Sequence, residues 1–151
     1  MKMWRKLFVT AALAFMLCLA GLVMSGEAQA QRLIDNGNGT VTDTQTGLMW
    51  TRDANLFGKR NWNDAMDTCS AFSISGIGGW RLPSSDELTY LSYAMAKGRP
   101  FTGIQFSFYW SSSTYRAFNA DHAWYVYSIN GYANFGSKTD THYVWCTRTS
   151  Q

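Results

Sequence analysis

The chain has 151 residues, with 13 Lys and Arg, 10 Asp and Glu, and a formal net charge of +3 at pH 7. The first thirty residues carry three of the basic residues and one of the acidic residues, so the remainder is nearly neutral at +1. This balance, without a clustered basic face, is not typical of a nucleic-acid-binding protein. The aromatic content of 16% predicts a packed core rather than a disordered polypeptide.

The N-terminus has the pattern of a secretory signal peptide. A basic segment, MKMWRK, precedes an unbroken apolar run over residues 7–24 and a small-residue cleavage site at residues 28–30. We therefore expect residues 1–30 to be removed and residues 31–151 to form one periplasmic, secreted or cell-surface domain. The alternative is an uncleaved membrane anchor, because the apolar run is nearly long enough to span a bilayer.

The segment DNGNGTVTDTQTGLMW, residues 35–50, could be a calcium loop or a series of strands. A loop of the EF-hand type needs oxygen ligands at positions 1, 3 and 5 and a glycine at position 6. Starting from Asp35, positions 3 and 5 are glycines, and starting from Asn36, position 6 is Val41, so neither frame fits. Short β-prone stretches separated by Gly, Asn and Asp predict a small β-meander instead.

Two amphipathic helices are predicted next. In NWNDAMDTCSAF, Asn61 is an N-cap and Asp64 an acidic first-turn residue, and one face is lined by Ala65, Met66, Cys69 and Phe72. In GWRLPSSDELTYLSYAMAKG, a short buried strand with Trp80 and Leu82 is stopped by Pro83. Ser84 and Glu87 form a capping box there. The apolar face is Leu88, Leu91 and Met95, and Gly98 ends the helix.

The remainder of the chain is predicted to be strand and loop. Residues 106–110 form an apolar strand, residues 111–122 a loop, and residues 123–129 a strand that Asn130-Gly131 turns back into residues 132–138. After a turn at residues 139–142, residues 143–148 form one final strand. Val144 and Cys146 would share one of its faces and Tyr143 and Trp145 the other.

Two cysteines, Cys69 and Cys146, follow the predicted signal peptide. In an exported protein they most simply form one disulfide, which would join the first helix to the last strand. A catalytic cysteine is the competing interpretation.

These segments together resemble the Lcl C-terminal domain family, named for the end domain of a bacterial collagen-like adhesin. The resemblance is carried in order by DNGNGTVTDTQTGLMW, NWNDAMDTC, GWRLPSSDEL, YWSSS, AWYV, NG and YVWCTR. It implies a variant of the C-type-lectin fold, here an α+β domain with two helices packed on small antiparallel sheets and one disulfide. It also implies binding rather than chemistry, since known members include adhesins for sulfated glycans and diversified receptors that vary in the hairpin before the last strand.

The sequence departs from calcium-dependent lectins and from many relatives. The lectin triplets Glu-Pro-Asn and Gln-Pro-Asp are absent, and the Trp-Asn-Asp at residues 62–64 opens the first helix, away from where a calcium site needs it. Trp145 stands where many relatives carry Arg, which would give the final strand an outward indole. Ser128 stands where many carry an aromatic residue, which would leave the core less filled.

The expected binding site is the hairpin over residues 127–142 and its neighbours. Trp50, Trp62, Trp80 and Trp124 are assigned to the core. Exposed aromatic side chains stack on sugars or on partner side chains, and polar side chains among them supply donors and acceptors. The candidate ligand-binding residues are Tyr125, Tyr127, Asn130, Tyr132, Asn134, Phe135, Lys138, Asp140, His142 and Trp145.

Other functions are weaker interpretations of the same residues. His122, His142, Asp121 and Asp140 could gather around a zinc ion, but their spacing is not that of a metal site. An enzyme related to formylglycine-generating enzymes would need reactive cysteines, and there is no Gly-x-Ser-x-Gly nucleophile motif. A structural or assembly module, which could form a homo-oligomer, is a third class. We therefore expect no cofactor and no metal, and a glycan or an extracellular protein as partner.

Overall fold

The computed structural model describes residues 31–95, 100–117 and 120–150. The predicted signal peptide and Gly98 lie outside these residues. The described part contains two helices and two sheets, which makes it a small α+β protein. None of its helices is long and apolar enough to span a bilayer.

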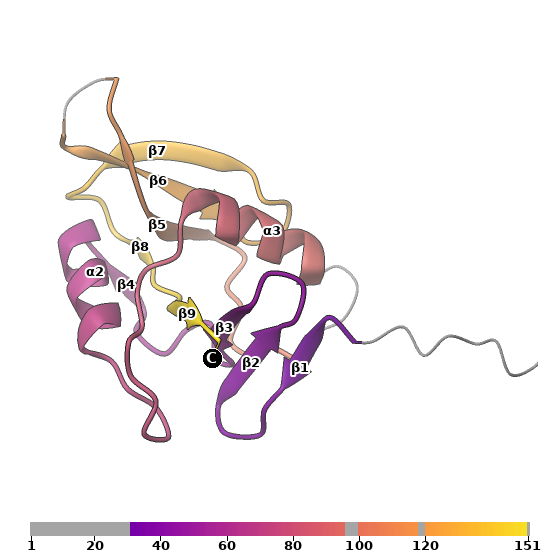
Figure 1. The fold of residues 1–151 in the computed structure, drawn as a ribbon. Coiled ribbons are helices and arrows are strands. Elements are labelled where there is room, and N and C mark those ends of the chain that lie inside the picture. The colour runs from indigo at the N-terminus through magenta and orange to yellow at the C-terminus, as the bar shows by residue number, and fades with distance from the viewer. Residues whose placement is uncertain (1–30, 96–99, 118–119, 151) are drawn as a thin grey trace, which may run out of the picture. The chain divides into compact units, whose positions relative to one another are not determined.

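The first sheet contains the predicted meander. Its strand order is β1 (Leu33–Asp35), β2 (Thr40–Asp43), β3 (Leu48–Thr51) and β9 (Thr147–Thr149). All neighbouring strands are antiparallel, and β9 returns from the far end of the chain to pair with β3 (Figure 1). The turn between β1 and β2 is closed by side chains that bind nearby backbone, such as Asp35 Oδ1, which accepts from the Gly37 N–H at 3.0 Å.

The second sheet has five strands in the order β4 (Lys59–Arg60), β8 (His142–Tyr143), β5 (Phe108–Tyr115), β6 (His122–Tyr127) and β7 (Ala133–Ser137). The pairing of β5 with β8 is parallel, so the expectation of purely antiparallel sheets is wrong for this pair. The long strands β5, β6 and β7 lie side by side in Figure 1. The Asn130-Gly131 turn joins β6 to β7 as predicted, and Gly131 has a φ of 69°, the left-handed region that glycine tolerates.

The prediction of a loop over residues 111–122 is partly wrong, because β5 continues through Ser111–Ser113 to Tyr115. The register with β6 shifts between Trp110 and Thr114, which is a bulge. The serines that look like loop residues in sequence satisfy hydrogen bonds within the fold. The Ser111 hydroxyl donates to the Trp124 carbonyl at 2.8 Å.

The two helices begin at the predicted capping residues. Helix α2 (Trp62–Ala71) has Asn61 as its N-cap, whose side chain accepts from the Asp64 N–H at 2.9 Å. Helix α3 (Ser85–Met95) begins with the capping box, in which Glu87 accepts from the Ser84 N–H at 2.8 Å and the Ser84 hydroxyl accepts from the Glu87 N–H at 3.2 Å. Arg81 also binds both carboxylate oxygens of Glu87, at 2.8 and 2.7 Å.

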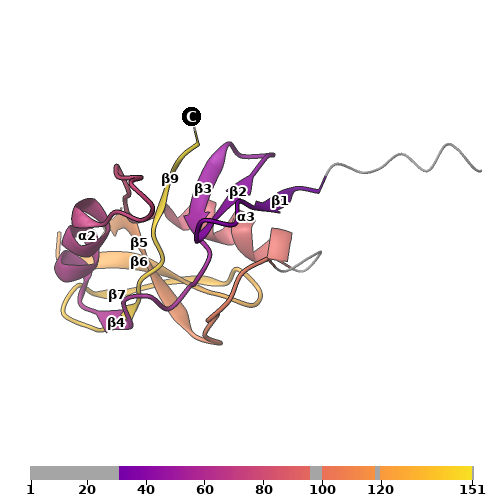
Figure 2. The same cartoon turned by 90° about the horizontal axis from the view of Figure 1, so that it is seen from below.

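The predicted final strand is split between the two sheets. Tyr143 ends β8 in the second sheet, residues 144–146 are not in a strand, and Thr147 begins β9 in the first sheet. Figure 2 shows β9 between α2 on one side and β3 on the other. The expected strand at Trp80 and Leu82 is reduced to a single bridge between Arg81 and Thr147.

The alternation in this segment still sorts its side chains between two cores. Val144 and Cys146 lie in the core beneath α2 with Ala65 and Trp110, and Cys146 forms the predicted disulfide with Cys69. Trp145 lies in the other core, between α3 and the first sheet, with Trp50 and the α3 leucines. The final segment therefore joins both sheets and both cores.

Acid should destabilise the protein through Asp43. Burial alone would raise the pKa of this carboxyl, but hydrogen bonds from Arg32, the Gln45 amide and Thr46 outweigh it, so the pKa is lowered on folding. Arg32 binds both oxygens, at 2.8 and 2.7 Å. A lowered pKa stabilises the fold fully above the unfolded pKa of about 4, and this contribution is lost as the pH falls through the folded pKa.

We therefore expect Asp43→Asn to lower the free energy of unfolding by about 2 kcal/mol at pH 7. The difference from the wild type should shrink below about pH 4, because the Asp43 carboxylate becomes protonated first in the unfolded chain and, at lower pH, in the folded protein. Urea titrations at pH 7, 4 and 3 measure this, with Asp67→Asn as the control that removes an exposed carboxylate. If the difference in unfolding free energy between Asp43→Asn and the wild type stayed constant with pH, the lowered pKa of Asp43 would be contradicted.

Candidate functional site

The second sheet has one face covered by α3 and an opposite face that α2 covers only in part. Successive residues of β6 point to opposite faces. Val126 packs in the core with Leu91 of α3, so Tyr125 and Tyr127 point the other way. Near α2 this opposite face is closed over Ala123 and Trp110, and beyond α2 it carries half-buried aromatic residues.

These residues form a connected cluster of rings. Phe108 on β5 contacts Tyr125 and Tyr127 on β6, with ring centroids 4.8 and 5.2 Å apart. His142 on β8 contacts Tyr125 at 4.2 Å and also Trp110 at 4.5 Å. Three neighbouring strands thus contribute to one aromatic surface, whose ring contacts fix the side chains without a ligand.

Tyr132 extends this surface into the hairpin. Asn134 pairs with Tyr125 across β6 and β7, and the Tyr127 N–H donates to the Tyr132 carbonyl at 2.8 Å, so the same register continues to Tyr132. The Tyr132 side chain is 58% exposed. We call the set Phe108, Tyr125, Tyr127, Tyr132 and His142 the aromatic face.

Polar groups lie beside these rings. The Asp140 carboxylate and the Tyr125 ring both lie close to Gly136. A Cβ built at this glycine would be 3.0 Å from the Tyr125 ring and 3.1 Å from Asp140 Oδ2. Burial raises the pKa of the Tyr125 phenol, and the charges of Asp140 and Tyr132 raise it further. Asn134, opposite Tyr125, adds an amide, so the rings are bordered by groups that can accept and donate hydrogen bonds.

The surroundings of His142 favour its neutral form. Burial lowers the pKa of its imidazole, the nearby Asp140 carboxylate raises it, and Lys59 lowers it, with a net decrease. Its Nε2 atom is buried and has no hydrogen-bond partner among the described residues. Arg60 lies opposite His142 on the edge strand β4 and is exposed, so the aromatic face ends in a cation that the sequence interpretation did not include.

A polar pocket of about 330 Å³ lies where β7 meets the start of α2, lined by Asn61, Asn63, Asp121, Ser137, Lys138 and Thr139. The Lys138 ammonium lies over the Trp62 ring, 4.1 Å from its centroid. Asn134 and Lys138 are four residues apart, so in an extended strand their side chains point to the same face of the sheet. The predicted residue Lys138 therefore lies at the α2 end of the same sheet face.

Two predicted site residues lie elsewhere. Trp145 is 1% exposed, and its Nε1 donates to the Thr51 carbonyl at 2.9 Å, so the expectation of an outward indole is wrong. The alternation was interpreted correctly, but a second core lies on the side that we expected to be solvent. Phe135 lies on the α3 side of the sheet and stacks on Tyr115, with ring centroids 3.8 Å apart.

The remaining predictions about the site have mixed outcomes. Asn130 is at the exposed hairpin turn, where its side chain accepts from the Tyr132 N–H at 3.0 Å. Trp50 and Trp80 are core residues, as expected, whereas Trp62 and Trp124 are half-buried. Phe108 was missed as a site residue, although its alternation with Tyr109 in the sequence could have placed it on the face opposite to the core.

In the part of the chain that the structure describes, no group of three or more His, Cys, Asp and Glu side chains is close enough to hold a metal ion.

The chain matches a known protein family over most of its length. A model of the Lcl C-terminal domain matches residues 39–148, which include both helices and the aromatic face. No curated protein matches the chain. Because the match extends over most of the 151 residues, the chain belongs to the Lcl C-terminal domain family.

Proposed function

We propose that the chain is an exported, non-enzymatic, C-type-lectin-like domain that binds a glycan through the aromatic face. The observation that carries the proposal is the cluster of Phe108, Tyr125 and Tyr127, whose half-buried rings contact one another on a sheet face. Aromatic rings stack on the C–H surfaces of sugars, and rings that are already ordered lose little entropy on binding.

The polar groups around the rings fit the hydroxyl groups of a sugar. Asn134 offers a donor and an acceptor, Asp140 an acceptor, and Arg60 a charged donor. A sugar needs such groups along the edge of the stacking rings, because its hydroxyls point outward from its C–H faces. Binding does not need calcium of the lectin type, since this face is built from rings and not from a carboxylate cluster.

Binding rather than catalysis is supported by the cysteines. Cys69 and Cys146 are both fully buried and joined in a disulfide, so neither is a free nucleophile. A formylglycine-type reaction would need a reactive thiol. The disulfide also supports export, because such bonds persist in oxidising compartments, and the basic and apolar N-terminal segment has the pattern of a signal peptide.

The ligand is to be identified by a glycan array, and its affinity then measured for two variants of the aromatic face. We expect Tyr127→Ala and Tyr132→Ala each to weaken binding about tenfold, which corresponds to about 1.4 kcal/mol. Isothermal titration calorimetry measures the affinity, and Tyr93→Ala is the matched control, since Tyr93 is 60% exposed but lies on α3.

The control should bind like the wild type. Unchanged affinity in both variants of the aromatic face, with the fold intact by circular dichroism, would rule out this location. Light scattering on the same samples tests the assembly alternative. A stable oligomer that binds no glycan on the array would favour a structural module over a lectin.

A further inference from the structure

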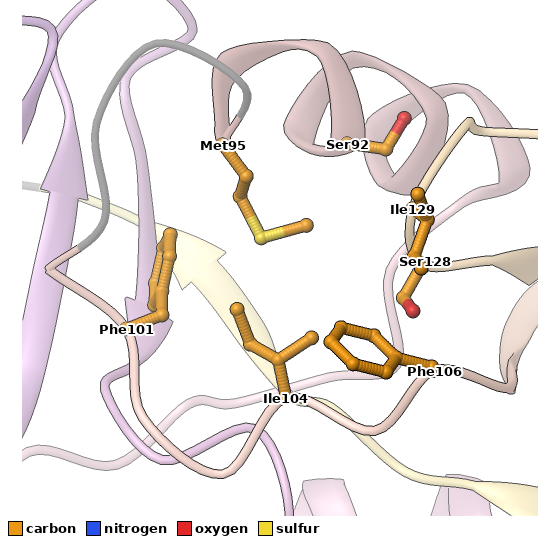
Figure 3. A pocket seen from close by; sticks show the side chains of 7 residues that line it. All are labelled: Ser92, Met95, Phe101, Ile104, Phe106, Ser128 and Ile129. Atoms are coloured by element: carbon orange, nitrogen blue, oxygen red, sulfur yellow. The ribbon is translucent and has the colours of Figure 1, made fainter.

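A second concave site lies on the α3 side of the molecule, away from the aromatic face. It is a pocket of about 520 Å³ between the C-terminal part of α3, the segment before β5 and the turn between β6 and β7. Figure 3 shows its lining side chains arranged around an open space, namely Ser92, Met95, Phe101, Ile104, Phe106, Ser128 and Ile129. This volume is within the range of small-molecule sites in proteins.

The described lining of the pocket is mainly apolar. Five of the seven side chains are apolar, and none is charged. The Ser92 hydroxyl donates to the Thr89 carbonyl at 2.7 Å, and the Ser128 hydroxyl donates to the Gln105 carbonyl at 2.6 Å. Because each hydroxyl proton is already used, the two serines can offer only acceptor lone pairs. These seven described side chains thus suit an apolar group with at most a neutral donor.

The rim of the pocket exposes apolar surface. Phe106 is 70% exposed and Ile129 is 55% exposed, although both are large and apolar. The inner wall is closed, since the void behind Met95 and Ser128 measures only about 10 Å³. This is no more than about one water molecule. A ligand would therefore stop at Ser128 and cover the rim, burying the phenyl and isoleucine surface from water.

Two small residues keep the space open. Ser128 is buried, and its side chain is too short to fill the pocket that it borders. Gly131 fixes the turn directly against α3, because a Cβ there would lie 2.5 Å from Ser92 Oγ and 3.2 Å from Thr89 Cγ2. The wall formed by the turn is thus held in place by contacts with α3.

From this geometry we propose that the pocket is a second binding site, which takes the uncharged alkyl chain of a lipid-like small molecule. The proposal is independent of the glycan site, because the two surfaces lie on opposite faces of the second sheet and share none of these residues.

Titration with 1-decanol, followed in methyl NMR spectra, tests the proposal. We expect saturable shifts of the Met95, Ile104 and Ile129 methyl signals with a dissociation constant of roughly 0.1 mM. Met49 and Met66, which pack against the other core, are internal controls and should not shift.

Two filling variants make the test specific. Ile104→Trp and Ser128→Phe should each raise the dissociation constant for 1-decanol at least tenfold, whereas Tyr90→Ala, on the exposed side of α3, should leave it unchanged. Using both variants guards against one of them failing to fold. Shifts at Met49 and Met66 equal to those at Met95, or unchanged affinity in the folded filling variants, would each overturn the proposal.

Discussion

Replacing Trp145 with alanine should lower the free energy of unfolding by about 3–5 kcal/mol, the usual cost of truncating a fully buried tryptophan. The indole is 1% exposed and contacts Trp50, Phe101 and Tyr109, with ring centroids 5.7, 4.9 and 5.6 Å away. Its Nε1 donates to the Thr51 carbonyl at 2.9 Å, so truncation also leaves this buried acceptor without that donor. Urea unfolding at neutral pH measures the loss.

The matched control for this prediction is an exposed aromatic residue. Tyr93→Ala removes a ring that is 60% exposed on α3, and it should change stability by no more than about 0.5 kcal/mol. The loss of unfolding free energy in Trp145→Phe should fall between the losses in Trp145→Ala and Tyr93→Ala, because phenylalanine retains ring contacts but has no indole N–H. If Trp145→Ala cost less than about 1 kcal/mol, the indole would not be the buried link between the first sheet and α3.

Removing the disulfide should be the other large effect. Cys69 lies in α2 and Cys146 lies between β8 and β9, with 77 residues of sequence separation. By the chain-entropy relation, closing a loop of this length stabilises the fold by about 4 kcal/mol. We expect the double variant Cys69→Ala/Cys146→Ala to lose about this amount relative to the oxidised wild type.

The stability of the reduced wild type separates the effect of losing the covalent bond from the effect of losing the packing of the sulfur atoms. The wild type under reducing conditions keeps both side chains but not the bond, so it should lose nearly as much stability as the double variant. The two comparisons are made by urea unfolding with and without reductant. Reduced and oxidised wild type of equal stability would contradict a structural role for the bond.

Local signals in the sequence predicted the elements that depend on nearby residues. Asn61 caps α2, and Ser84 and Glu87 form the capping box of α3, because each of these bonds spans only three residues. The β-meander is likewise closed by turns of its own sequence. The cysteine pairing was predictable because only two cysteines follow the signal-like segment.

Features that depend on distant contacts were not predictable in this way. The alternation in residues 143–148 was interpreted correctly, but nothing local shows that both of its faces meet a core, and so Trp145 was placed in solvent. The serines after Trp110 resemble a loop in sequence, and they continue β5 because β6 and Pro83 accept their hydrogen bonds. By contrast, alternation along β7 places Phe135 on the face opposite to Tyr132 and Asn134, so this part of the site was predictable from the sequence and was missed.

In the proposed function, the glycan binds to the aromatic face of the second sheet, and not to the opposite face or to α3. Ring ¹³C–¹H NMR of tyrosine-labelled protein tests it directly, in a titration with the glycan that the array identifies. We predict saturable shifts of the Tyr125, Tyr127 and Tyr132 ring signals, with the Tyr90 and Tyr93 signals of α3 unchanged. Shifts confined to Tyr90 and Tyr93, or saturation of the glycan without any shift at Tyr125, Tyr127 and Tyr132, would contradict the account.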